Sequence, residues 1–126
     1  MHETSLEFRR PFQLWLHAVS HRNLLLRSVK SSAELTRVDI LFHNVRAVQI
    51  PTLMDSLRIS IEAIRPLEEA CGRFGVKATA DCKLYALSSD QFSGLVIASN
   101  MTSHEDALEY GDPSFFAPAL TPILGF

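Results

Sequence analysis

The chain has 126 residues, of which 47% are hydrophobic and 21% are charged, and its formal net charge is −2. This length accommodates one hydrophobic core, so we expect a single globular domain over residues 1–126, with 114–126 as an apolar, proline-containing tail. The near-neutral charge argues against binding to nucleic acid or to an anionic membrane surface. No apolar run is long enough to cross a bilayer and no signal peptide precedes Phe12, which together predict a cytoplasmic protein.

The first half of the chain predicts short strands separated by polar turns. Residues 1–11 predict a lead-in or a short edge strand, and residues 12–19 alternate with apolar groups on both faces. A turn at 20–23 leads to a second strand at 24–30. Residues 36–43 also alternate, so we expect their even-numbered side chains to point inward and their odd-numbered ones outward. His43-Asn44 predicts the next turn, before a strand at 45–50 that Pro51 closes.

The second half predicts one helix among further strands. Residues 57–63 alternate most clearly, and a helix is expected from Pro66 to Phe74, with Glu68-Glu69 near its positive end and Gly72 or Gly75 at its end. Residues 83–88 and 95–102 predict a hairpin, and 106–110 a helical turn. The predicted fold class is therefore α+β, mostly β: an antiparallel meander sheet of about six to seven strands with one short helix.

Neither a metal nor a cofactor is expected from the sequence. His17 and His21 are four residues apart, but a strand running into a turn does not bring them together, and no carboxylate or thiolate lies at ligand spacing with them. Gly72 to Gly75 lacks the lysine and hydroxyl of a phosphate loop. Cys71 and Cys82 are expected to be buried, inert thiols, and a disulfide requires the helix around Cys71 to lie beside the strand of Cys82.

Five polar residues are candidates for a binding site: His17, His21, Arg27, Asp39 and His43. Histidine can act as a base or a ligand near neutral pH, and Asp39 interrupts an apolar strand as a general base or an arginine partner would. The alternative interpretation treats the histidines as structural or surface residues. It places Asp39 on the solvated face, in a cross-strand ion pair worth at most about 1 kcal/mol, whereas the functional interpretation gives Asp39 an arginine partner such as Arg27.

Four arginines recur about once per strand: Arg27, Arg37, Arg46 and Arg58. If their faces coincide, they form a basic stripe that can bind an acidic partner. The same recurrence also serves solubility and protects strand edges, so both interpretations remain open.

Four segments carry a resemblance to a known group of proteins: WLHAVSHRNLLLRS (15–28), RVDILFHNV (37–45), IPTLMDSLRI (50–59) and GDPSFF (111–116). The pattern W-x-x-x-V-S-H-x-x-L-L-L-R-S followed by D-x-x-F resembles a family of small bacterial proteins that form a domain of unknown function. The resemblance implies a bacterial, cytoplasmic origin and marks Ser20-His21 as a position of interest. In size and architecture the chain also resembles immunity proteins of bacterial toxin systems.

These observations predict a protein-interaction or binding module with no catalytic activity evident in the sequence. Self-association through a strand edge or the apolar tail, as a homodimer, is the expected mode. One alternative is a small enzyme or ligand-binding domain that uses His17, His21, His43 and Asp39 around an open end of the sheet. Another is an immunity protein that binds a bacterial toxin.

Overall fold

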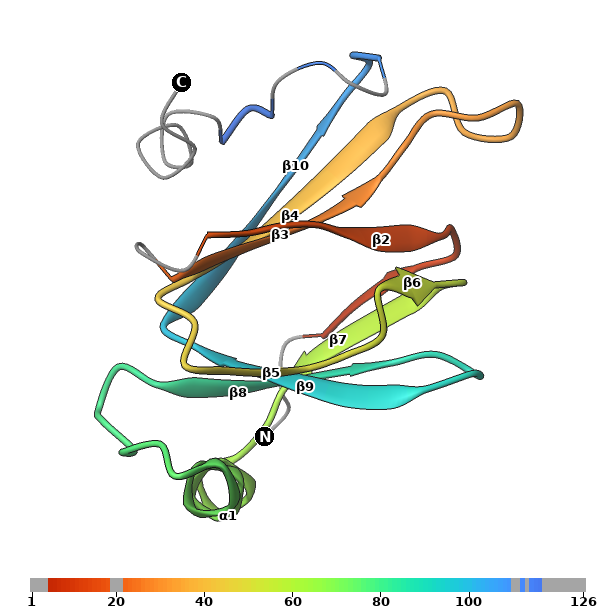
Figure 1. Ribbon diagram of the computed structural model, residues 1–126. Helices are drawn as coiled ribbons and strands as arrows, with labels where there is room; N and C mark the ends of the chain where they lie inside the picture. The colour runs from red at the N-terminus through yellow and green to blue at the C-terminus, as the bar shows by residue number, and fades with distance from the viewer. Residues whose placement is uncertain (1–4, 19–21, 110–111, 113, 117–126) are drawn as a thin grey trace.

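The computed structural model describes residues 5–18, 22–109, 112 and 114–116 (Figure 1). Within these residues the chain forms ten strands in two antiparallel sheets and one short helix. The predicted mostly β class with a single helix is confirmed. The strands exceed the expected six to seven because several predicted segments divide, and they form two packed sheets.

The two sheets have five strands each. In spatial order, sheet A contains β1 (Ser5–Phe8), β7 (Leu57–Ile61), β8 (Lys83–Ser88), β9 (Ser93–Ala98) and β5 (Ala47–Gln49). Sheet B contains β10 (Asn100–Asp106), β4 (Arg37–His43), β3 (Asn23–Ser28), β2 (Phe12–Ala18) and β6 (Leu53–Met54). Figure 1 shows the sheets one above the other, with the helix α1 (Ile64–Phe74) on the outside of sheet A. The described residues after β10, which are 107–109, 112 and 114–116 and are called the C-terminal segment below, lie on the outside of sheet B.

The main core fills the space between the sheets. The predicted inward face of β4 is confirmed, because Val38, Ile40 and Phe42 belong to this core and are at most 3% exposed. Phe42 meets Tyr85 of β8 edge to face, with the ring centroids 5.3 Å apart. The side chains on the face that the alternation predicted therefore also join the two sheets.

The helix begins two residues before the predicted Pro66, which lies in its first turn. It ends at Gly75, whose φ of +70° is a left-handed conformation that glycine adopts without steric cost. The expectation that Glu68-Glu69 lie at its positive end is wrong, since the first turn contains no acidic residue. The buried face of the helix packs against the outside of sheet A in a cluster that contains Leu67, Ala70, Cys71, Cys82, Leu84 and Ile97.

One corner of the molecule carries the chain between the sheets twice. β4 continues into β5 through residues 44–46, and β9 continues into β10 through Ser99. The register of pairing differs by one residue between β5–β9 and β4–β10. The β4–β5 and β9–β10 segments therefore pass from one sheet to the other side by side, with an irregularity in their pairing at the bend. Asn44 has a φ of +53° there, and its amide donates to Ser99 Oγ at 2.8 Å. The predicted strand at 95–102 is therefore divided at Ser99.

Two other expectations concern the ends of the chain. The N-terminal edge strand is confirmed, because β1 lies at the edge of sheet A. The predicted helical turn at 106–110 is wrong for its described part, since Asp106 ends β10 and residues 107–109 are irregular. The tail beyond Phe116 lies outside the described residues. No helix of the described part is long and apolar enough to cross a membrane.

Candidate functional site

The outer face of sheet B differs most from the sequence expectation. Its odd-numbered β4 side chains point away from the core as predicted, but Arg37 and Asp39 are only 1% exposed. A bulge between Leu14 and Leu16 helps to cover this face. The bulge lets both Trp15 and Leu16 pack on the outer side, although neighbouring strand residues usually alternate.

Arg27 and Asp39 form a buried pair across β3 and β4. Arg27 Nε donates to Asp39 Oδ1 at 2.7 Å and Nη2 donates to Oδ2 at 3.0 Å, which is the two-bond geometry of a strong guanidinium–carboxylate contact. Ser114 Oγ also donates to Oδ2, at 2.6 Å. The predicted pair is present, but its expected place on a solvated face is wrong, because the side chains are 1% and 2% exposed.

A second pair fixes the C-terminal segment to the same face. Arg37 Nε and Nη2 donate to the two carboxylate oxygens of Asp106, each at 3.1 Å. Arg37 Nη1 donates to the carbonyl oxygens of Glu109 (3.1 Å) and Asp112 (2.7 Å), and Arg27 Nη1 donates to the latter at 3.3 Å. Both guanidinium groups therefore connect the sheet to a segment more than 70 residues later in the chain.

Two phenylalanines complete the cover. The Phe115 ring stacks on His104 of β10 at a centroid distance of 4.0 Å, and Phe116 packs against the cluster of Leu25 and Leu41. Arg27 also lies over the ring of Trp15, 4.6 Å from its centroid. The first residues of the predicted apolar tail thus pack on their own chain.

The Arg37–Asp106 pair predicts a dependence of stability on pH. Burial raises the pKa of the Asp106 carboxyl, but hydrogen bonds from Arg37 and the Leu108 N–H outweigh it, so this pKa lies below its ordinary value of 3.8. A carboxyl whose pKa is lower in the folded state stabilises the protein above the unfolded-state pKa and ceases to do so as pH falls through the folded-state value. We expect Asp106→Asn to lower the urea midpoint at neutral pH.

The difference between Asp106→Asn and the unmodified protein should shrink as the pH falls below 3.8. Glu69→Gln is the matched control, since Glu69 is an exposed helix residue that carries the same charge. An Asp106→Asn deficit that stays constant with pH would refute the electrostatic origin of the effect. Urea titrations across the acidic range give this comparison directly.

The candidate histidines do not converge with Asp39. His17 lies opposite Leu24, which in turn lies opposite Phe42 in the core, so these three share the inner face of sheet B. His43 follows Phe42 and therefore lies on the outer face; its Nε2 is 3.3 Å from Thr102 Oγ1 and partial burial lowers its pKa. His21 lies outside the described residues. A general base also needs a free oxygen, whereas both Asp39 oxygens already accept hydrogen bonds.

The prediction that the four arginines form one basic stripe is wrong. Arg27 and Arg37 lie on the outer face of sheet B, Arg46 lies at the corner between the sheets, and exposed Arg58 lies in sheet A, where it donates to Ser88. These positions belong to three different surfaces. The recurrence in sequence therefore does not correspond to one basic surface.

Cys71 and Cys82 belong to the cluster between α1 and sheet A, and both are buried free thiols. Burial raises the pKa of the Cys71 thiol, and the charge of a Cys82 thiolate raises it further, against the opposing effect of Arg46. Such a thiol is protonated and unreactive at neutral pH. In the described ranges no group of three histidine, cysteine, aspartate or glutamate side chains could hold a metal ion.

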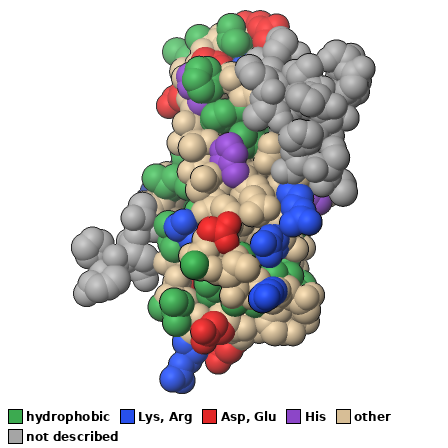
Figure 2. All heavy atoms as spheres, turned by 90° about the vertical axis from the view of Figure 1, so that its left-hand side faces the viewer, with side chains coloured by type: hydrophobic (Ala, Val, Ile, Leu, Met, Phe, Trp, Pro, Cys, Tyr) green, Lys and Arg blue, Asp and Glu red, His purple; other side chains and the backbone are tan. Residues whose placement is uncertain are grey.

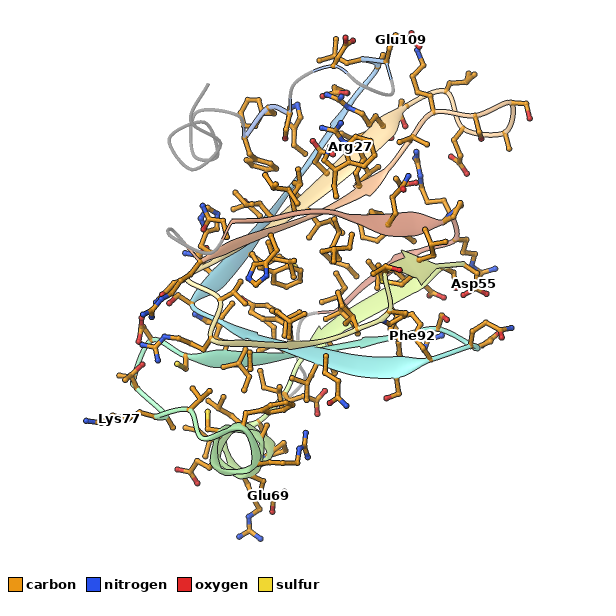
Figure 3. The ribbon with its side chains drawn as sticks, viewed as in Figure 1. Arg27, Asp55, Glu69, Lys77, Phe92 and Glu109 are labelled. Carbon is orange, nitrogen blue, oxygen red and sulfur yellow. The ribbon has the colours of Figure 1, made fainter. Side chains whose placement is uncertain are left out.

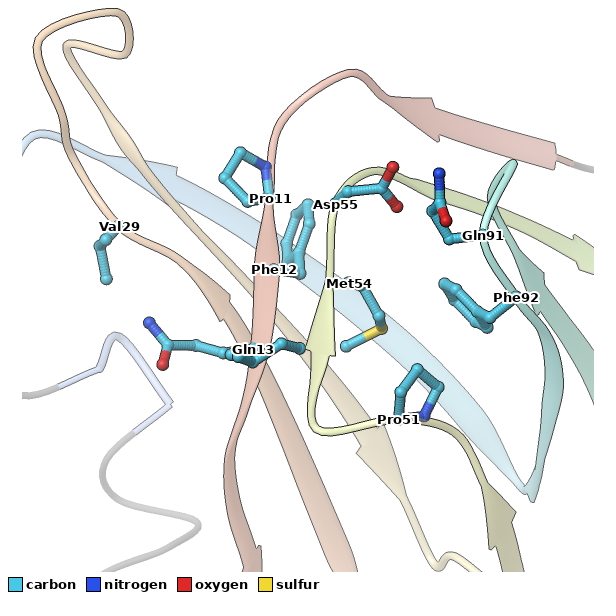
Figure 4. Close-up of a pocket in the computed structure, with 10 residues that line it drawn as sticks. Pro11, Phe12, Gln13, Val29, Pro51, Met54, Asp55, Gln91 and Phe92 are labelled. Carbon is cyan, nitrogen blue, oxygen red and sulfur yellow. The ribbon is translucent and has the colours of Figure 1, made fainter.

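An apolar pocket of about 510 Å³ opens at one end of the sandwich. Figure 4 shows Phe12, Met54 and Phe92 around its middle, with Asp55 and Gln91 to one side. None of the four described residues predicted for a site, His17, Arg27, Asp39 and His43, lines it. The pocket is suited to an apolar group, and it lacks the histidines that the enzyme alternative requires there.

Strand β10 offers a long free edge, because no described strand pairs with its outer side. Its seven residues pair with β4 without a bulge, from Asn100 opposite His43 to Asp106 opposite Arg37. The other edge strands, β1, β5 and β6, have only four, three and two residues. Sequence reasoning missed this edge because 95–102 was predicted as one strand. The polar residues on both faces of 102–106 are typical of an edge and could have indicated it.

Comparisons of the chain with protein-family models, curated proteins and solved structures find no match. The functional assignment therefore depends on the geometry of the chain. Its charged interior residues bind the C-terminal segment, and no described strand pairs with the outer side of the seven-residue strand β10.

Proposed function

We propose that the protein is an interaction module that pairs with a second copy of itself through β10, to form one antiparallel sheet across the two copies. The length and regularity of this edge carry the proposal. Exposed edges are usually kept short or interrupted by proline, lysine or a bulge, because their free N–H and C=O groups attract other strands. Over its seven residues β10 has no proline, lysine or bulge, and its acidic residues, Glu105 and Asp106, lie at one end.

The sequence of β10 suits pairing with itself. Two identical antiparallel strands related by a two-fold axis at Ser103 place that residue opposite its own copy. In this register every charged residue lies opposite an uncharged or differently charged one, so no like charges face each other. The facing residues are Asn100 with Asp106, Met101 with Glu105, and Thr102 with His104.

The contacts on the outer face of sheet B hold β10 in place for this role. Asp106 is fixed by two hydrogen bonds from Arg37, and His104 is stacked between its strand and Phe115. A strand that is already ordered loses little conformational entropy when it binds. The C-terminal segment therefore supports the edge from one face, and no described strand pairs with the outer side of β10.

Ser103→Lys tests the proposal. It places two ammonium groups opposite each other across the two-fold axis, so we expect it to abolish the dimer. The exposed loop variant Ser32→Lys has the same charge change and is the matched control. Light scattering should give twice the mass of the 14.1 kDa chain for the unmodified protein and Ser32→Lys, and the single mass for Ser103→Lys, whose circular dichroism spectrum should stay that of the folded protein. An unmodified protein that remains a monomer at every concentration contradicts the proposal.

We also propose that the protein works in the bacterial cytoplasm. The two buried free thiols support a reducing compartment, where cysteines usually stay unpaired. The bacterial origin rests on the resemblance of the four sequence segments alone. An immunity role would use the same edge to bind a strand of a toxin, and co-purification with a toxin encoded beside it would test that role.

A further inference from the structure

A second pocket, of about 430 Å³, lies at the opposite end of the sandwich from Asp55 and Phe92. Figure 3 shows Lys77 at this end, and Figure 2 looks onto it and shows blue lysine and arginine side chains gathered there, with acidic groups nearby. The described lining contains three cations and one histidine but no carboxylate. It consists of His17, Arg22, Val45, Arg46, Gly75, Val76 and Lys77.

Arg46, one of the lining residues, has an unsatisfied donor. Its Nε is buried and makes no hydrogen bond within the described part of the chain. A buried donor next to a charge costs free energy unless it has a partner. Asp81 is close enough for Arg46 to lower its pKa, but hydrogen bonds from Thr79 and Ser99 are the larger causes of that shift.

The backbone around the pocket is held by specific hydrogen bonds. The Val45 N–H donates to the Arg22 carbonyl at 2.6 Å, which ties the corner between the sheets to the start of β3. The Val76 N–H donates to the Cys71 carbonyl at 2.8 Å, directly after the left-handed Gly75. The backbone of two parts of the lining is thus fixed, as is usual for a binding site formed before its ligand arrives.

We propose that this pocket binds a small organic phosphate, whose phosphate group contacts the cations and whose apolar body contacts Val45 and Val76. Arginine guanidinium groups form paired, charge-assisted hydrogen bonds with phosphate oxygens, and lysine adds a point charge. Three cations suit a dianion better than a monoanion. A pocket of this volume also falls in the range that holds organic ligands rather than a bare ion. The site is independent of the β10 edge.

Phenyl phosphate is the probe, and inorganic phosphate, benzoate and sodium chloride at equal ionic strength are its comparators. The melting temperature of the full chain should rise with phenyl phosphate concentration, because a ligand that binds only the folded state stabilises it. Backbone amide NMR should show shifts centred on His17, Val45 and Val76. Binding equal to that of inorganic phosphate or benzoate would overturn the assignment to an organic phosphate.

Arg22→Gln and Lys77→Gln test the lining. Both residues are exposed at the pocket rim, so the fold should tolerate their replacement. Each should weaken phenyl phosphate binding about tenfold, whereas Arg65→Gln, an exposed helix residue outside the pocket, should leave it unchanged. An equal loss in all three variants would show that only the overall charge matters, and no loss in any of them would show that the lining cations do not contact the probe; either result would overturn the site. The mass of the dimer formed through β10 should be the same in all three variants, so this test is separate from the test of the β10 edge.

Discussion

Asp39→Asn is expected to lower the free energy of unfolding by about 3–5 kcal/mol, because it removes one partner of a buried ion pair. The variant keeps the shape of the side chain but leaves Arg27, only 1% exposed, without its opposite charge. Ser114 also loses a charged acceptor. Urea denaturation at neutral pH, followed by the fluorescence of Trp15 next to the pair, measures the loss.

Two further variants separate burial from charge. Glu109→Gln breaks an ion pair with Lys30 in which the glutamate side chain is 76% exposed, so it should change the stability by only about 0.2–1 kcal/mol. The double variant Arg27→Met with Asp39→Leu should recover much of the Asp39→Asn loss, since it leaves no buried charge. If Asp39→Asn costs no more than Glu109→Gln, the pair is not buried in solution.

Gly94→Ala should destabilise the fold by about 1–3 kcal/mol through overpacking. Gly94 lies in β9 beside β5, and a Cβ added there would be 2.2 Å from the Gln49 carbonyl oxygen and 3.1 Å from Ile50 Cγ2. The first of these atoms is backbone, so β5 has to move away from β9. Thermal unfolding of the purified variant checks the effect.

Gly72→Ala is the control for this substitution, with an effect of opposite sign. A Cβ at Gly72 meets nothing within 4 Å, and the residue lies inside α1, where alanine is more favourable than glycine by about 0.5–1 kcal/mol. We therefore expect Gly72→Ala to raise the melting temperature while Gly94→Ala lowers it. A neutral or stabilising Gly94→Ala would contradict the close approach of β5 and β9.

Local periodicity predicted the parts of the fold that depend on neighbouring residues. The inward face of β4, with Ile40 at its centre, follows from alternation, and the end of α1 at Gly75 follows from the left-handed conformation that glycine permits. The Arg27–Asp39 pair was also predictable as a cross-strand contact, since both residues are polar positions in adjacent strands.

The burial of that pair was not predictable. Arg37 and Asp39 occupy the face that alternation assigns to solvent, and their cover comes from Asp112 and Ser114, more than 70 residues later. No local pattern records a contact over such a separation. The basic pocket has the same origin, because its lining comes from segments that lie far apart in the sequence.

The β10 edge is tested most directly by a cysteine at its proposed two-fold axis. Side chains that face each other across antiparallel strands have Cβ atoms about 4.5–5.5 Å apart, close to the separation that a disulfide needs. The two native thiols are buried and serve as an internal reference. Under mild oxidation, Ser103→Cys should form a covalent dimer nearly completely and Ser32→Cys should not. A Ser103→Cys protein that stays monomeric, or that cross-links no faster than Ser32→Cys, would contradict pairing through β10.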